Sequence, residues 1–109
     1  MQHDLEEKVL HIACSAIDGN LGLLEAVNRL FPILVTRPDL VSLEDFNFVC
    51  AVESQTDDLP TGRLRNEWHP DFLPEKDREI ARCEEIWGSQ ILKVCERVRR
   101  ALLLRKLVT

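Results

Sequence analysis

The apolar residues near the start of the chain recur at i, i+4, i+7 and i+11: Leu5, Val9, Ile12 and Ala16. This spacing places them on one face of an α-helix. Carboxylates gather at the beginning of the segment, where the free amides of a helix N-terminus attract negative charge. The pattern predicts an amphipathic helix over about residues 5–16.

A second apolar stripe follows a turn. Gly19 permits a positive φ and Asn20 is a good N-cap residue, so we expect the second helix to begin at Asn20. The stripe itself consists of Leu23, Val27, Leu30 and Leu34. Because Pro32 has no backbone amide, it should kink the helix or shorten its last turns.

The third segment is ambiguous between helix and strand. Ser42 followed by Asp45 resembles a weak capping box and predicts a helix that starts near Leu43. Apolar residues alternate over 46–52, as in a strand, but the same residues fit a helical face equally well. No second strand is apparent for pairing, and an isolated strand leaves its backbone groups unsatisfied, so helix is favoured. A short strand at 46–52 is the alternative.

A polar, proline-rich stretch over 54–74 separates this segment from a long helical pattern over 75–106. Pro60 and Gly62 predict a turn within the stretch. A helix of about 32 residues would extend about 48 Å, longer than such a domain is wide. We therefore expect a bend at Gly88 and Ser89, or an end that serves a second chain. The fold class is all-α: a small helical bundle with an ordered Pro/Gly loop and a long C-terminal helix (alternative: α+β).

Composition limits the class of protein. The chain has 109 residues, 45% of them apolar and 30% charged, which excludes collagen-like, low-complexity and disordered chains. Folding at this length removes about two-thirds of the accessible surface, enough for a single domain over 1–109. The longest apolar run, 31–35, cannot cross a bilayer, and no export signal opens the chain, so we expect a cytoplasmic protein without membrane association.

Charge is divided unevenly. Residues 1–62 contain 11 acidic and 3 basic side chains, whereas residues 63–109 contain 11 basic and 8 acidic ones. This division predicts either an acidic face for a basic partner or two halves that attract each other within the fold.

Two carboxylates at helical spacing form the main candidate site. Glu53 and Asp57 would share one helical face, with Asp58 adjacent. Such a group could divide acid and base roles or hold a divalent cation. The favoured interpretation is structural: Arg63 or Arg65 folds back onto Asp57 or Glu53 and fixes the loop. Exposed, unpaired carboxylates are a further alternative.

Other motifs give little sign of chemistry. His11 and Cys14 are three residues apart, as two zinc ligands could be, but no second pair follows. Signatures of nucleophilic and phosphate-binding sites are absent. The cysteines are widely spaced and read as reduced core thiols: Cys14, Cys50, Cys83 and Cys95. We expect no cofactor and no metal, and catalysis is disfavoured.

The loop contains a recognisable signature, E-S-x-T-D-x-L-P-x-G-x-x-R-x-x-W, over residues 53–68, followed by Glu75, Lys76, Asp77 and Glu79. With a second stretch at 21–25, it resembles the signature of a family of short bacterial proteins without an assigned activity. The likeness covers about half of the chain and implies a bacterial, cytoplasmic origin. His69 and Cys83 lie outside the pattern. Physically, the motif reads as a structured loop in which Trp68 buries a large apolar surface.

The C-terminal segment suggests two binding modes. Its cations could bind phosphates. However, cations also suit the end of a helix, the chain is acidic overall, and the segment has no aromatic residues for base stacking, so nucleic acid is disfavoured as a partner. Apolar residues on more than one face instead predict a homodimer seam or a groove-bound partner helix: Leu102, Leu103, Leu104, Leu107 and Val108.

These observations favour a non-catalytic bacterial protein-binding domain of an accessory, regulatory or toxin-neutralising type. It would use an acidic surface, suited to a basic partner, and the apolar C-terminal helix. One alternative is a hydrolase-like or metal-dependent enzyme that uses Glu53, Asp57, Asp58 and His69. The other is a nucleic-acid-binding regulator that uses the basic C-terminal helix. The sequence identifies neither the partner, the substrate nor the oligomeric number.

Overall fold

The computed structural model describes residues 2–108, and the side chains of all of these except residues 2, 3, 63 and 64. Its four α-helices are α1 (Gln2–Ile17), α2 (Leu23–Thr36), α3 (Leu43–Thr56) and α4 (Leu73–Val108). Two short 3-10 helices connect them, η1 (Pro38–Leu40) and η2 (Gly62–Glu67). The described range contains no strand, so the all-α prediction is confirmed. The alternative strand at 46–52 is wrong, because these residues lie within α3.

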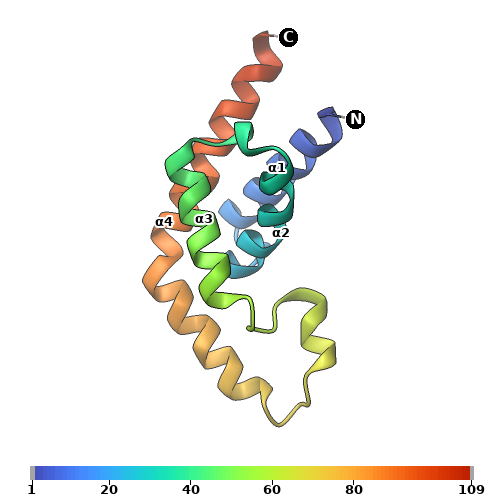
Figure 1. Cartoon of the computed structure of the whole chain (residues 1–109), viewed down its shortest axis with the longest axis vertical. Helices are drawn as coiled ribbons and strands as arrows, with labels where there is room; N and C mark the ends of the chain where they lie inside the picture. Colours follow the sequence, from blue (N-terminus) through green and yellow to red (C-terminus); the bar gives the residue numbers. More distant parts are fainter. Residues whose placement is uncertain (1, 109) are drawn as a thin grey trace.

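The helix α4 runs along nearly the full length of the molecule, and the other three helices pack against its upper part (Figure 1). Both ends of the chain lie at the same end of the molecule (Figure 1). At the rise of an α-helix, the 36 residues of α4 cover about 54 Å along the helix, more than the longest dimension of the molecule, 50 Å. The helix does not break at Gly88 and Ser89, but its axis changes direction near its middle, in the region of the predicted bend (Figure 1).

Gly88 also serves close packing. It is buried, and the Cδ1 atom of Leu23 lies 3.0 Å from the position that a Cβ atom would occupy on it. The missing side chain therefore allows the first turn of α2 to approach α4 closely.

The boundaries of α2 and α3 follow from their caps. The N-cap of α2 is Gly22 rather than the predicted Asn20, and Gly22 has no side chain that could cap the helix. Pro32 lies inside α2 without ending it, and the helix continues to Thr36. At the start of α3 the hydroxyl of Ser42 accepts a hydrogen bond from the amide of Asp45, at 3.1 Å, as the capping pattern predicts.

The core lies where α1, α2 and α3 meet the second half of α4. Its buried apolar side chains from the first three helices are Val9, Ile12, Ala13, Ala16, Leu24, Ala26, Val27, Leu30, Leu34, Val49 and Val52. Those from η1, the loop and α4 are Leu40, Leu59, Ile91, Val94, Cys95, Val98 and Leu102. The first half of α4 extends beyond this core, and the loop from α3 leads to its first turn (Figure 1).

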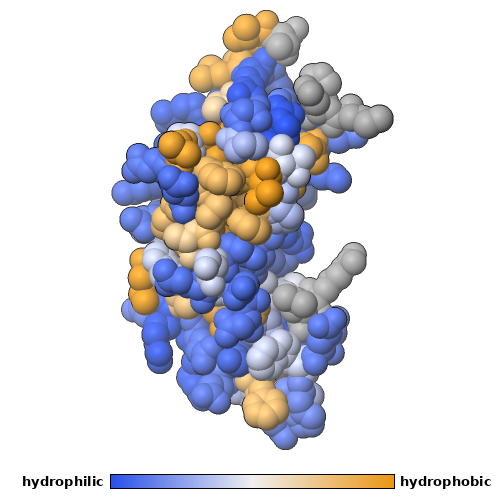
Figure 2. Space-filling view, viewed as in Figure 1, coloured by the Kyte–Doolittle hydropathy of each residue, from blue (hydrophilic) through white to orange (hydrophobic). Residues whose placement is uncertain are grey.

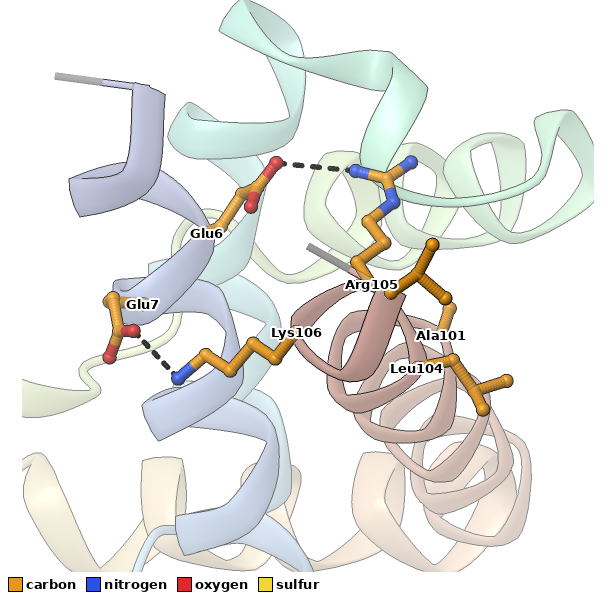
Figure 3. A pocket seen from close by; sticks show the side chains of 7 residues that line it. Glu6, Glu7, Ala101, Leu104, Arg105 and Lys106 are labelled. Atoms are coloured by element: carbon orange, nitrogen blue, oxygen red, sulfur yellow. Dashed lines mark hydrogen bonds and ion pairs between the residues drawn. The ribbon is translucent and has the colours of Figure 1, made fainter.

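Ion pairs join the acidic first half of the chain to the basic second half. The buried carboxylate of Asp45 on α3 accepts hydrogen bonds from Arg97 Nε at 3.0 Å and Nη2 at 2.8 Å. At the end of α4, Arg105 and Lys106 reach two carboxylates of α1 at 3.3 and 2.6 Å (Figure 3). The internal attraction that the charge division allowed is therefore present in the fold.

All four cysteines are free thiols. Only Cys95 is fully buried, and this burial raises the pKa of its thiol to about 11. Within residues 2–108, no helix combines the length and the apolar character that a membrane span requires.

Candidate functional site

The loop after α3 begins with buried residues at the end of that helix. Thr56 is buried, and its hydroxyl donates a hydrogen bond to the carbonyl oxygen of Val52 at 2.7 Å. Leu59 and Pro60 follow and are also buried. The loop is therefore anchored in the core at its beginning, because these apolar groups leave water together.

The next residues of the loop rest on α2. The side-chain amide of Asn28 donates a hydrogen bond to the hydroxyl of Thr61. Gly62 has a φ of +56°, and the carboxyl group of Glu25 lies 3.6 Å from where its Cβ would be. A side chain at this position would strain the backbone, so the turn requires glycine.

The end of the loop is tied to the first turns of α4. Two nitrogens of Arg65 donate hydrogen bonds to the two carboxylate oxygens of Asp77. This pairing lowers the pKa of Asp77 and raises that of Arg65. Lys76 Nζ lies 5.2 Å from the ring centroid of Trp68, which is half-buried.

The predicted clamp of Arg65 on Asp57 or Glu53 is therefore wrong. Arg65 reaches forward to α4 instead of back to α3, because the turn at Gly62 carries the chain away from the end of α3 and η2 leads towards Asp77. The side chain of Arg63, the other candidate, lies outside the described part of the structure.

Glu53 and Asp57 face a surface hollow of about 450 Å³ between α2, α3 and the loop. We call it the polar hollow, and its lining residues are Glu25, Asn28, Arg29, Glu53, Asp57, Thr61 and Gly62. The Oε2 atom of Glu53 is buried and has no hydrogen-bond partner among the described residues. Burial raises the pKa of Glu53, and the nearby charge of Asp57 raises it further. The two carboxylates that the sequence singled out are thus brought together.

Among the described side chains, Arg29 is the cation that lines the polar hollow, and its guanidinium pairs with Glu25 one turn earlier on α2. Sequence reasoning did not include either residue in the candidate site. Their i, i+4 spacing on one helix was the available signal. It did not show that this face of α2 would meet the end of α3.

The remaining candidates lie elsewhere. Asp58 does not line the polar hollow. Burial raises the pKa of Cys83 on α4, and the charge of Glu79 and, to a smaller extent, that of Asp58 raise it further. His69 lies beside Asp71, with 3.5 Å between Nδ1 and a carboxylate oxygen, and packs edge-on against Phe72. Among the described side chains, no group of three His, Cys, Asp or Glu residues is arranged to hold a metal ion.

The second candidate site is the exposed end of α4, which we call the apolar tip. Its members are Leu103, Leu104, Leu107 and Val108, with exposed fractions of 44%, 54%, 83% and 85%. Figure 2 shows apolar groups at this end of the molecule and over the upper part of the bundle, above a mostly polar lower half. Exposed apolar side chains in the bundle include Val35 and Leu43.

A surface hollow of about 430 Å³ lies at the apolar tip. Ala101, Leu104 and Val108 contribute its apolar lining, and the ion pairs between α1 and α4 contribute its charged part (Figure 3). Arg105 and Lys106 extend from α4 towards α1, whereas Leu104 points away from α1 (Figure 3). The tip therefore presents apolar groups on the side of α4 that α1 leaves uncovered.

The two stretches that carry the resemblance to short bacterial proteins, residues 21–25 and 53–68, meet at the polar hollow, to which both contribute lining residues. Several residues of the signature have a structural role there: Thr56, Leu59 and Pro60 are buried, and Gly62 forms the turn. Searches with models of protein families, among curated proteins and among solved structures found no match to this chain.

Proposed function

We propose that this chain is a non-catalytic protein-binding domain that uses the apolar tip as its contact surface. The observation that carries this proposal is that more than four-fifths of the surface of Leu107 and of Val108 is exposed, next to two half-exposed leucines. Contiguous apolar surface of this kind is uncommon on proteins that act alone, because each exposed apolar group costs free energy in water. An accessory, regulatory or toxin-neutralising role in the bacterial cytoplasm belongs to this proposal.

The basic partner expected from the acidic first half stays a prediction. Three carboxylates of that half, Glu6, Glu7 and Asp45, are paired with cations of the second half. Exposed acidic side chains that form no ion pair with the described residues remain on the surface, among them Asp4 and Asp18. The charge division therefore supports internal attraction more directly than it supports a basic partner.

Affinity capture of the tagged full chain from its native host tests the proposal. A protein retained at a fixed stoichiometry is the expected result, and light scattering of the purified chain at several concentrations reports whether that protein is a second copy. A chain that stays monomeric and retains no protein would contradict the proposal.

A second candidate function is acid–base catalysis in the polar hollow. It is favoured by one observation: the half-buried carboxyl group of Glu53 has an unpartnered oxygen and a raised pKa beside Asp57. A screen with chromogenic ester, phosphoester and glycoside substrates tests it. Turnover that is lost in Glu53→Gln and kept in the control Asp58→Asn would support this candidate, and absence of turnover would count against it.

A further inference from the structure

The border of the apolar tip is positively charged. From Arg97 to Val108, α4 contains five cations and no carboxylate. Three of these cations pair with carboxylates of α1 or α3: Arg97, Arg105 and Lys106. Arg99 and Arg100 form no ion pair with the described residues, and Arg100 is exposed. Two positive charges that form no ion pair with the described residues therefore lie directly before the tip, one turn after Glu96.

These charges and the apolar residues form two parallel rows on α4, because residues four apart lie one above the other on a helix. One row consists of Arg99, Leu103 and Leu107, and the other of Arg100, Leu104 and Val108. In each row a cation is followed by two exposed apolar side chains. A straight double row of this kind fits a second helix, whose apolar face can lie along it.

The two arginines favour a partner helix that carries negative charge. A helix that covers the leucines continues over Arg99 and Arg100, where carboxylates are favoured and cations are repelled. A second copy of this chain would bring the same arginines, and its α4 offers no carboxylate between 97 and 108 to meet them. Charge complementarity therefore favours a partner other than a second copy.

A membrane surface fits less well. A planar anionic bilayer would approach every group at this end of the molecule, including the exposed carboxylate of Asp4 on α1. The tip also occupies only the last turns of α4, whereas helices that bind the bilayer interface usually present a long apolar face. A helix of a partner protein covers only the uncovered side of α4.

From these contacts we infer that the apolar tip binds an acidic amphipathic helix of a partner protein. The leucines pack into its apolar face, and Arg99 and Arg100 pair with carboxylates one turn further along it. This inference rests on the proposed protein-binding function and specifies the chemistry of the partner.

Two synthetic peptides test the inference. Both are amphipathic helices of about 18 residues with the same leucine stripe, one flanked by glutamates and the other by lysines. Fluorescence anisotropy measures their binding to the full chain. The glutamate peptide is expected to bind about tenfold or more tightly than the lysine peptide at low salt, and this preference should shrink as salt screens the charges.

Matched variants locate the binding. The double variant Leu103→Gln with Leu107→Gln should lose binding of both peptides, and Arg99→Glu with Arg100→Glu should reverse the preference. Leu43→Gln is the control, because Leu43 is an exposed leucine, at 75%, on α3. It should bind like the wild type. Circular dichroism checks that each variant keeps its helical content.

Four outcomes would overturn the inference: no binding of the glutamate peptide, equal binding of both peptides, binding that survives the tip variants, or loss of binding in Leu43→Gln. Binding to phosphatidylserine vesicles in place of the peptides would assign the tip to a membrane. A dimer of the wild type that is absent in the leucine variants would show that the tip binds a second copy of this chain. If the wild type and the leucine variants capture the same host protein equally, the chain binds protein but not through the apolar tip. If neither captures a host protein, the proposed function itself is contradicted.

Discussion

Glu84 on α4 caps the N-terminus of α2 at Leu23. One carboxylate oxygen of Glu84 accepts hydrogen bonds from the backbone amides of Leu23, at 2.7 Å, and of the next residue, at 3.2 Å. The local N-cap, Gly22, has no side chain for this purpose. A residue 61 positions away therefore supplies both the acceptor and the negative charge that a helix N-terminus favours.

Replacing this cap should destabilise the fold. We expect Glu84→Ala to lower the free energy of unfolding by about 1 to 2 kcal/mol, because two partly buried amides lose their acceptor. Glu84→Gln should cost less, since its amide oxygen still accepts a hydrogen bond. Urea denaturation measures both. The control is Glu85→Ala at an exposed position on the same helix. Equal losses at 84 and 85 would show that the cap contributes nothing.

The close packing of α2 on α4 should exclude a large side chain at Gly88. Gly88→Leu is expected to cost about 1 to 3 kcal/mol or more, because the new side chain must displace Leu23 from its contact with α4. Ser89→Leu, at an exposed position next to it, should leave stability nearly unchanged. Thermal unfolding of the two variants distinguishes packing at this point from a general effect of leucine in α4. A tolerated leucine at 88 would contradict the packing described.

The carboxyl group of Glu53 should make stability depend on pH. Its pKa is raised in the folded chain, so the folded state holds the proton longer than the unfolded state as pH rises. Stability is therefore lost across the interval between the ordinary pKa of glutamate and the raised value. Glu53→Gln removes this loss.

The expected result is that Glu53→Gln is more stable than the wild type at neutral pH and that this advantage shrinks below the ordinary pKa of glutamate. Denaturation of both proteins at several pH values measures the difference. Asp58→Asn is the control outside the polar hollow, and its effect should not follow the same course. An advantage of Glu53→Gln that is independent of pH would show that the charge of Glu53 is not the cause.

The loop should be held by Arg65 and Asp77 acting together. Arg65→Ala and Asp77→Ala are each expected to lower the melting temperature slightly, and the double variant should lose no more than either single one. Arg65→Ala combined with Asp57→Ala should give additive effects, because these two residues do not pair. Additivity of Arg65 with Asp77 would contradict the ion pair.

Periodicity in the sequence predicted the helices well, because α1, α2 and α4 each carry a regular apolar stripe. It also favoured helix over strand for α3, from the absence of a second strand. Gly19 has the positive φ that its turn predicted, and the turn predicted from Pro60 and Gly62 is present, with a positive φ at Gly62 that the prediction did not include. These features depend on neighbours in sequence, which a single chain displays directly.

The contacts between distant segments could not be predicted in the same way. Arg65 had carboxylates on both sides of it in sequence, and only the path of η2 decided that Asp77 was the partner. Glu84 resembled any other exposed acid of a charged helix until α2 was placed against it. The contact of Gly88 with Leu23 is likewise not visible in the spacing.

The contacts of the first half of α4 have a consequence for local unfolding. Glu84 holds the start of α2, and Asp77 holds Arg65 of the loop. Separation of this half of α4 from the bundle would break both contacts at once, so the amide hydrogens of the loop and of the first turn of α2 should exchange with solvent as one cooperative unit.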